Sequence, residues 1–552
     1  MRRLSPVRAA LALVGLVVTL LGVGLPAEAA NYVPISGAGS TWSQNAIDQW
    51  RRNVNQYGMQ VNYQGTGSSD GRNQFRNGTV DFGVSEIPYG VKDQGVYDSP
   101  PTRKYAYMPI VAGGTSFMYN LKIAGKKVTN LRLDGANVAK IFTGAITMWN
   151  DPALVKDNPG LALPARSIVP VVRSDGSGTT AQFTLWMSKQ NSGTWNDYCA
   201  SNGLSTPCGQ TSNYPVKSGS PFVALAGSLG VSGYVSQSQS EGSITYVEYS
   251  YALNTGFPVV KVLNNSGYYT EPNAQNVAVA LMKSAINDDK TSSQYLTQIL
   301  DGVYNNTDPR TYPLSSYSYL IIPTAAEGSF NLDKGHTLGA FANYFLCEGQ
   351  QQTPLLGYSP LPLNLVKAGL EQVKRIPGMD TQNVDISKCN NPTFSSDGSN
   401  TLATTAPQPA ACDKQGPLQC GTGTGGAKQT TAVAPAAAGG GTGSAPGTPG
   451  APGSTTPGGT TPGAPGAPGA AVPGLTPGGA GAAIDPDTGA PMVGSDPGVA
   501  AAGTVNAIPV SVSVGLGAGL SHTLFVLAGL LLLALVLLPP LLARRFAGDN
   551  QK

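Results

Sequence analysis

Three short segments rich in glycine, serine and threonine have the chemistry to hold an anion. They are residues 37–42, 65–70 and 173–180, and each comes directly before a stretch with helical character. Backbone N–H groups and small hydroxyls would gather at the positive end of a helix dipole, which can hold an oxyanion without a metal. Any one such turn is more often only a helix cap. None has the lysine of a P-loop, and the first two do not fit GxGxxG, so nucleotide binding is disfavoured.

The third segment adds charged groups to this chemistry. Arg173 carries a planar guanidinium that suits a tetrahedral oxyanion, and Asp175, two residues later, is well placed to orient it. The alternative interpretation is a surface ion pair beside a helix cap.

A hydrolase is the first alternative function. Ser68 or Ser177 could act as a nucleophile only with a base to activate it. Residues 31–390 contain a single histidine, His336, and no nucleophile-elbow pattern surrounds it. We therefore expect no enzymatic activity and no cofactor. The net charge of +3 in 552 residues, without a basic tract, also disfavours nucleic acid as a partner.

The surrounding residues predict an α/β fold over residues 31–390. Ile47, Trp50 and Val54 follow the first turn at helical spacing. Five stretches have the character of strands: 59–63, 80–84, 167–172, 244–249 and 317–322. The repeated order of strand, glycine turn and helix is typical of the α/β class.

Both ends of the chain carry signals for export and anchoring. Residues 1–29 combine basic residues, an apolar stretch and a small-x-small site, which predicts a secretory signal peptide. Residues 391–512 are dominated by Gly, Pro, Ala and Thr, which predicts a disordered linker. Residues 520–543 predict a transmembrane helix. Two arginines follow it, so we expect residues 544–552 in the cytoplasm and the folded part outside the cell, on a single-pass membrane protein.

Six cysteines in an exported chain predict disulfides. Several pairings are possible, and proximity in the sequence is only a weak guide to them. Proximity favours Cys199 with Cys208 and Cys412 with Cys420, which leaves Cys347 with Cys389. A metal cluster is the alternative, but the chain has no CxxC spacing and only two histidines.

The glycine-rich segments and their flanks together resemble a known family. In this order they closely resemble the phosphate-binding proteins of PstS type, the extracytoplasmic receptors of phosphate ABC importers. The segments are ISGAGSTW (35–42), VNYQGTGSS (61–69), VDFGVSEIP (80–88), IFTG (141–144) with WND (149–151), and YVEY (246–249). The most specific run is RSDGSGT (173–179), and the likeness covers about residues 31–377.

The resemblance implies a type II periplasmic-binding-protein fold, in which two α/β lobes close on the ligand. Lobe 1 would comprise about residues 31–108 and 250–390, and lobe 2 about residues 109–249. We expect the two hinge crossings near residues 107–111 and 244–251.

The resemblance also implies a phosphate site, carried over residue by residue. Its ligands would be Thr41, the backbone N–H of Trp42, Ser68, Arg173, Ser177, Gly178 and Thr179, with Asp175 holding Arg173 and Glu86 accepting a hydrogen bond from the phosphate proton. Sulfate has no such proton at neutral pH, so the carboxylate would reject it. The family usually has Phe at position 42 and Asp at position 86. The extra methylene of Glu86 shifts its oxygens, and Glu86 could instead cap a neighbouring turn.

The implied function is extracytoplasmic capture of inorganic phosphate for delivery to an ABC permease and ATPase. Two alternatives remain open from the sequence. One is a tethered phosphate sensor or surface protein that is not coupled to import, and the other is binding of a different tetrahedral oxyanion.

Overall fold

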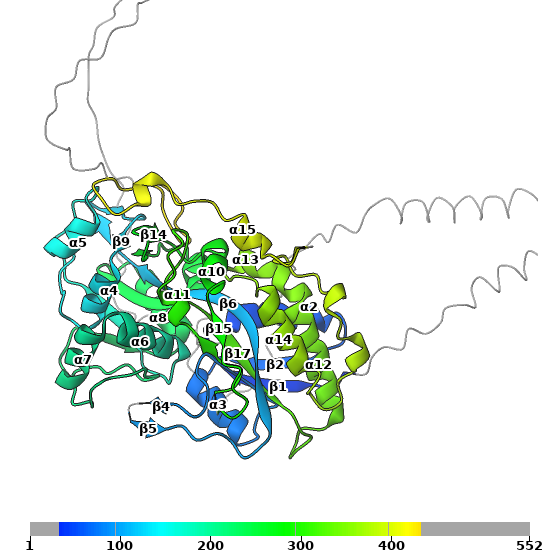
Figure 1. Cartoon of the computed structure of the whole chain (residues 1–552). Helices are drawn as coiled ribbons and strands as arrows, with labels where there is room; N and C mark the ends of the chain where they lie inside the picture. Colours follow the sequence, from blue (N-terminus) through cyan, green and yellow to red (C-terminus); the bar gives the residue numbers. More distant parts are fainter. Residues whose placement is uncertain (1–31, 94, 293, 396, 432–552) are drawn as a thin grey trace, which may run out of the picture. The chain divides into compact units, whose positions relative to one another are not determined.

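The computed structural model describes residues 32–93, 95–292, 294–395 and 397–431 (Figure 1). The expected signal peptide, residues 432–512 of the expected linker, the expected membrane span at 520–543 and the tail at 544–552 lie outside the described residues. Those predictions therefore stay predictions. Within the described part, no helix is both long enough and apolar enough to cross a bilayer.

An eight-stranded sheet runs through the described chain in the order β11-β10-β12-β6-β17-β3-β1-β2. Lobe 1 contains β1 (Ile35–Gly39), β2 (Val61–Gln64), β3 (Phe82–Ser85) and β17 (Ser315–Pro323). Lobe 2 contains β10 (Val169–Arg173), β11 (Val223–Leu225) and β12 (Ser243–Glu248). Strand β6 (Tyr105–Tyr119) belongs to both. The parallel pairs β1–β2, β1–β3, β10–β11 and β10–β12 confirm the predicted two-lobed α/β class.

Helices cover both lobes (Figure 1). Lobe 1 carries α2 (Gln44–Asn55), α3 (Ser68–Arg76), α12 (Leu332–Leu346), α13 (Thr353–Leu356) and α14 (Leu363–Val373). Lobe 2 carries α4 (Gly135–Phe142), α5 (Pro152–Asp157), α6 (Gly178–Gln190), α7 (Ser192–Ser201), α8 (Gly227–Ser236) and α9 (Tyr249–Thr255). In α2, the buried side chains include Ile47, Trp50 and Val54, so the predicted helical spacing is confirmed.

Shorter elements complete the fold. The small strands are β4 (Lys92–Asp93), β5 (Val96–Tyr97), β7 (Lys122–Ile123), β8 (Lys126–Lys127), β9 (Arg132–Leu133), β13 (Lys261–Leu263), β14 (Tyr269–Thr270), β15 (Ala285–Ile286) and β16 (Gln298–Ile299). The remaining helices are α10 (Ala274–Leu281), α11 (Asp301–Tyr304), α15 (Thr401–Thr404) and the 3-10 turns η1 (Glu348–Gln352), η2 (Thr381–Asn383), η3 (Ile386–Lys388) and η4 (Ala411–Asp413).

Strand β6 is the first passage between the lobes. Its residues 105–114 pair antiparallel with β17, and residues 115–119 pair antiparallel with β12. Gly113 lies beside this change of partner, and a Cβ there would stand 2.8 Å from the ring of Trp42. Only glycine permits so close an approach of the strand to the turn that carries Trp42.

Both crossings differ from our expectation. The first was expected near residues 107–111, but β6 changes partner only after residue 114. The second was expected near residues 244–251, but β12 stays paired within lobe 2 and β13 pairs with β9 of the same lobe. The chain returns after β14, where α10 packs against β17. In β6 the change of partner falls within the run Gly113-Gly114-Thr115-Ser116, which breaks an otherwise mostly apolar strand.

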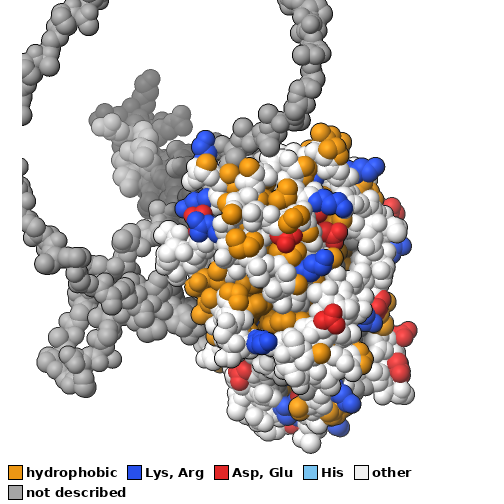
Figure 2. Space-filling view, turned by 90° about the vertical axis from the view of Figure 1, so that its left-hand side faces the viewer, with side chains coloured by type: hydrophobic (Ala, Val, Ile, Leu, Met, Phe, Trp, Pro, Cys, Tyr) orange, Lys and Arg blue, Asp and Glu red, His pale blue; other side chains and the backbone are white. Residues whose placement is uncertain are grey.

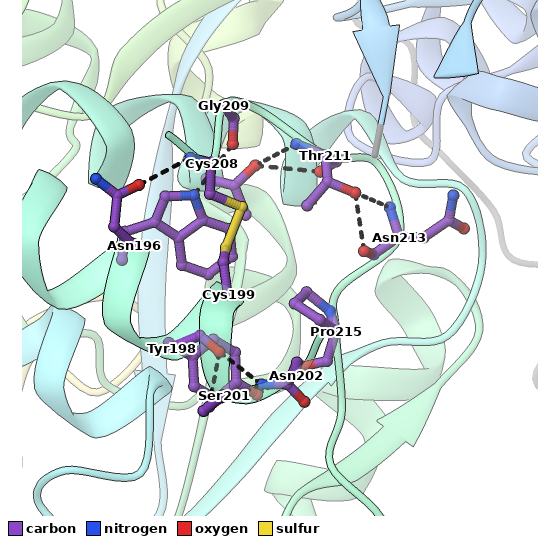
Figure 3. Close-up of a disulfide and its surroundings, with 12 residues drawn as sticks. Asn196, Tyr198, Cys199, Ser201, Asn202, Cys208, Gly209, Thr211, Asn213 and Pro215 are labelled. Atoms are coloured by element: carbon purple, nitrogen blue, oxygen red, sulfur yellow. Dashed lines mark hydrogen bonds between the residues drawn. A yellow bond between two sulfur atoms is a disulfide. The ribbon is translucent and has the colours of Figure 1, made fainter. Parts of the chain in front are cut away.

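The three expected disulfides are present: Cys199–Cys208, Cys347–Cys389 and Cys412–Cys420. Figure 3 shows the first of them, which ties α7 to the loop that follows it. In the same region the Cys208 N–H donates to the Asn196 side chain at 2.8 Å, and the Tyr198 hydroxyl donates to the Pro215 carbonyl at 2.5 Å. This loop is therefore held against α7 at several points.

Residues 391–431, which we call the strap, correct the expected start of the linker. We expected disorder from residue 391, but the strap is part of the folded domain. It begins on lobe 1, where the Asn391 and Thr393 side chains donate to the Leu361 carbonyl at 3.2 and 2.9 Å. It ends on lobe 2, where the Thr424 N–H donates to the Thr129 carbonyl at 3.0 Å. Figure 1 shows its yellow part running from α15 past α10 towards β14 and α5.

The strap is held through its backbone as well as through polar side chains, which explains why its composition is misleading. The Arg132 guanidinium, 1% exposed, donates to three strap carbonyls, those of Cys412, Gly416 and Leu418, at 3.0, 2.9 and 2.7 Å. Lys261 of lobe 2 pairs with Asp413 at 2.8 Å. Such contacts require few apolar side chains, so a segment rich in Gly, Pro, Ala and Thr can still pack.

Candidate functional site

The candidate site residues follow the carboxyl ends of parallel strands. Thr41 and Trp42 follow β1, Ser68 begins α3 after β2, and Glu86 comes directly after β3. On lobe 2, Arg173 ends β10. Ligands of open α/β sheets bind at this edge, because helix N-termini and loops meet there. All these side chains are buried, with Glu86 1% and Arg173 2% exposed.

Hydroxyl groups surround the Glu86 carboxylate. Its Oε1 accepts hydrogen bonds from Ser40 Oγ at 2.6 Å and from Ser318 Oγ, and its Oε2 accepts one from Ser68 Oγ at 2.8 Å. The Glu86 carbonyl accepts from the Gln182 amide of α6 at 2.8 Å. Glu86 therefore lies among the hydroxyl groups of Ser40, Ser68 and Ser318.

The N-terminus of α6 lies directly against Glu86. A Cβ built on Gly178 would be 1.9 Å from Glu86 Oε2 and 2.4 Å from Ser68 Oγ. Only glycine fits between the lobes at this point. Beside it, Ser177 caps the helix by accepting from the Thr180 N–H at 3.2 Å. The buried Thr179 hydroxyl has no hydrogen-bond partner among the described residues.

Arg173 is oriented as expected. Its Nε donates to Asp175 Oδ1 at 2.7 Å and its Nη2 to Oδ2, so the two planar groups meet side by side. Asp175 Oδ1 also accepts from the Gly227 N–H at 3.0 Å. Burial acts to raise the pKa of Asp175, but the hydrogen bonds and charge of Arg173 outweigh it and lower that pKa below its usual range. The carboxylate therefore stays ionised and leaves Nη1 of Arg173 free of Asp175.

Ser228, at the start of α8, connects the two lobes within the site. Its Oγ accepts from Arg173 Nη1 at 3.3 Å and lies 2.8 Å from Thr41 Oγ1. Its N–H donates to the Thr41 hydroxyl at 3.2 Å. The sequence did not single out Ser228, because a Gly-Ser pair at a helix start is too common to be a signal.

The backbone of the first turn is fixed by tyrosines. The Tyr251 hydroxyl donates to the Thr41 carbonyl at 2.5 Å, and the Tyr358 hydroxyl donates to the Trp42 carbonyl at 2.6 Å. The Trp42 N–H, an expected ligand, donates to Ser40 Oγ at 3.0 Å. The Trp42 ring is buried against the edge of Tyr358.

Further contacts cross between the lobes beside the site. The Ser69 N–H donates to the Gly176 carbonyl at 3.0 Å. Asp93, on the β4–β5 hairpin of lobe 1, accepts from the Ser212 N–H at 3.0 Å and from the Ser212 hydroxyl. The Ser212 carbonyl in turn accepts from the Ser177 N–H at 2.9 Å. The hairpin thus reaches the backbone of the α6 turn through a single residue of lobe 2.

The arrangement offers little to the alternative chemistries. His336 stacks on Tyr32, with 5.3 Å between ring centroids, whereas Ser68 donates to Glu86 and Ser177 accepts from Thr180. Within the described ranges, no group of three or more His, Cys, Asp or Glu side chains is placed to hold a metal ion. Basic and acidic side chains are interspersed on the face drawn in Figure 2, which gives a nucleic acid backbone no continuous basic surface there.

Comparison with known proteins supports a single family. The family model described as a PBP superfamily domain matches residues 25–348. The phosphate-binding protein PstS of Xylella fastidiosa (strain Temecula1) is 33% identical over 348 residues, which is 62% of this chain and 85% of that protein. The PstS protein of Haemophilus influenzae is 30% identical over 351 residues, covering 63% and 95%. A solved phosphate binding protein from Stenotrophomonas maltophilia has a TM-score of 0.46 at 18% identity, covering 67% of this chain and 99% of that chain. The family model and the two curated relatives place this chain in the PBP superfamily, and within it the chain belongs to the PstS-type phosphate-binding proteins.

Proposed function

We propose that this protein binds inorganic phosphate outside the cell and delivers it to an ABC importer. The observation that carries the proposal is that one guanidinium, Arg173, and one carboxylate, Glu86, share a buried site otherwise made of hydroxyls and helix N-termini. A ligand that satisfies both groups must be an anion and must also have a proton to donate. Monohydrogen phosphate meets both conditions. The names of the curated relatives support this ligand.

The proposed ligand shell uses groups from both lobes. It consists of Thr41, Ser68 and Glu86 from lobe 1, and Arg173, Ser177, Gly178 and Thr179 from lobe 2, with Asp175 orienting Arg173. The Trp42 N–H of the expected set is left out, because it donates to Ser40 Oγ. The unpartnered Thr179 hydroxyl and the N-terminus of α6 favour an anion at this place. Because the shell is divided between the lobes, phosphate binding requires their closure.

Titration of phosphate and sulfate into wild type and Glu86→Gln tests the proposal. Wild type should prefer phosphate strongly. In the variant, phosphate loses a charge-assisted hydrogen bond worth about 1.5–3 kcal/mol, while sulfate gains an amide donor, so the preference should narrow. Glu241→Gln, an exchange at the partner of Arg166 in lobe 2, is the matched control and should change neither affinity.

Two outcomes of this titration contradict the proposal in different ways. A wild type that prefers sulfate means that the ligand is wrong. An unchanged phosphate-to-sulfate ratio in Glu86→Gln means that Glu86 does not contact the ligand.

The remaining parts of the proposal concern location and partners. Residues 1–29 direct export, residues 520–543 anchor the chain, and the partners are a phosphate permease and its ATPase. A binding role without catalysis is part of the proposal, because the single histidine of the described residues, His336, stacks on Tyr32, and Ser177 accepts from the Thr180 N–H. Cells that lack the gene for this protein should take up less labelled phosphate at low external concentration. Normal uptake in those cells would favour a tethered sensor instead.

A further inference from the structure

We propose that Ser40 and Ser318 are positioning residues that fix the Glu86 carboxylate as a single acceptor for a protonated tetrahedral oxyanion. This role rests on the proposed function and concerns the specificity of the same site. Neither serine belongs to the expected ligand set. They come from different parts of lobe 1, Ser40 from the turn after β1 and Ser318 from β17.

Glu86 depends on hydroxyl groups for the compensation of its charge. Among the residues that the structure describes, it forms no ion pair, since Arg173 is engaged by Asp175. A carboxylate that is 1% exposed must be stabilised by hydrogen-bond donors. Three serine hydroxyls supply them.

The direction of the Ser40 hydrogen bond is fixed by its surroundings. The Trp42 N–H can only donate, and it donates to Ser40 Oγ at 3.0 Å. The single Ser40 proton is therefore left for Glu86 Oε1 at 2.6 Å. Ser318, fully buried, donates to the same Oε1. The two lone pairs of Oε1 are thus both occupied.

The other carboxylate oxygen has one acceptor position left. Oε2 accepts from Ser68 at 2.8 Å, which occupies one of its two lone pairs. This oxygen lies against the N-terminus of α6, as the 1.9 Å distance to a Cβ on Gly178 shows. Glu86 therefore presents one free lone pair at the junction of the lobes, where the proposed anion is held.

The two serines have a specific physical task because position 86 is a glutamate. A glutamate has one more side-chain torsion than an aspartate, so its carboxylate can turn further. With Oε1 held by Ser40 and Ser318, the remaining lone pair of Oε2 has a fixed direction. A phosphate hydroxyl can use that direction, whereas sulfate, without a proton, is repelled by it.

Ser40→Ala and Ser318→Ala in the full-length protein test this role. In each variant the carboxylate can turn, so phosphate loses a well-aligned hydrogen bond while sulfate, which forms none, loses little. Calorimetric titration of both anions should show the phosphate-to-sulfate affinity ratio falling about tenfold. Ser318→Thr keeps the hydroxyl and should restore most of the ratio.

Ser316→Ala is the matched control. Ser316 lies two residues before Ser318 on the same strand, is buried, and its hydroxyl has no hydrogen-bond partner among the described residues. Loss of the Ser316 hydroxyl should leave the phosphate-to-sulfate affinity ratio unchanged. A general weakening of lobe 1 would lower the affinity for both anions, so the ratio separates positioning from a structural effect.

The outcomes separate the two proposals. A wild type that does not bind phosphate contradicts the proposed function itself. A wild type that selects phosphate, with alanine variants that keep its ratio, contradicts only the role of Ser40 and Ser318. If one alanine variant does not fold, the other decides alone.

Discussion

Loss of Arg132 should release the strap from lobe 2. The Arg132 side chain donates to the carbonyls of Cys412, Gly416 and Leu418 and to that of Asp157, and its guanidinium lies 4.5 Å from the centroid of the Tyr269 ring. In Arg132→Ala, the three strap carbonyls lose their donor at once. An alanine has no donor that could replace a guanidinium reaching three backbone oxygens.

The size of the effect follows from these unpaired groups. Cys412 is half-buried, and Gly416 and Leu418 are exposed, so water can reach the freed carbonyls and each lost hydrogen bond costs about 1 kcal/mol. Counting also the hydrogen bond to Asp157 and the contact with the Tyr269 ring, we expect a loss of about 3–5 kcal/mol in the free energy of unfolding. Phosphate affinity should change little, since no strap residue belongs to the proposed ligand shell.

Denaturant unfolding measures the loss in the free energy of unfolding, and hydrogen exchange shows which amides lose protection. Amides such as that of Thr424, which donates to Thr129, should lose protection in Arg132→Ala. Arg166→Ala is the control, because Arg166 is 45% exposed and its ion pair with Glu241 is worth at most about 1 kcal/mol. If Arg132→Ala is as stable as Arg166→Ala, and the hydrogen exchange of the strap amides is unchanged, the role of Arg132 is refuted.

Two further predictions concern the junction of the lobes. Asp93→Ala removes the acceptor that holds Ser212, so phosphate should dissociate about fivefold faster by stopped-flow measurement. An unchanged dissociation rate contradicts a role of the β4–β5 hairpin in keeping the lobes closed. Burial raises the pKa of Glu248 well above its usual 4.5, although hydrogen bonds from Ser250 oppose this. The neutral form of Glu248 therefore stabilises the fold fully below pH 4.5, and this contribution to the free energy of unfolding is lost as the pH rises through the raised pKa. In Glu248→Gln, unfolding curves measured from pH 4 to 8 should no longer show this decrease in the free energy of unfolding. An equal pH dependence of the free energy of unfolding in wild type and Glu248→Gln would contradict this prediction.

The sequence reveals those parts of the site whose chemistry is local. Arg173 and Asp175 are two residues apart, and the turn between β10 and α6 brings their planar groups together within one short segment. The glycine turns likewise mark where strands end, and the resemblance to PstS-type proteins supplied the candidate ligands on them. Ser318 and Ser228 reach the site only through strand pairing and lobe contact, and nothing in their neighbouring residues distinguishes them from other serines.

The fold shows the same division between local and distant information. Alternating strands and helices predict the α/β class, because burial patterns are local. The lobe assignment of β13 depends on its pairing with β9, more than a hundred residues earlier in the chain, and no local pattern records that pairing. The strap was missed because backbone groups, which every residue carries, and scattered polar side chains provide its contacts. The cysteine pair at 412 and 420 was the one local sign that this segment has a defined structure.

In the proposed function, closure of the lobes completes the phosphate site. Thr41 and Arg173 belong to different lobes, yet both contact the Ser228 hydroxyl. Glu86 approaches Gly178 so closely that no larger residue could stand there. Neither lobe alone can therefore compensate the charge of an anion and also accept its proton. The preference for a protonated oxyanion must then be expressed mainly in the closed state, so variants at Glu86 should alter how far a given anion shifts the closing equilibrium.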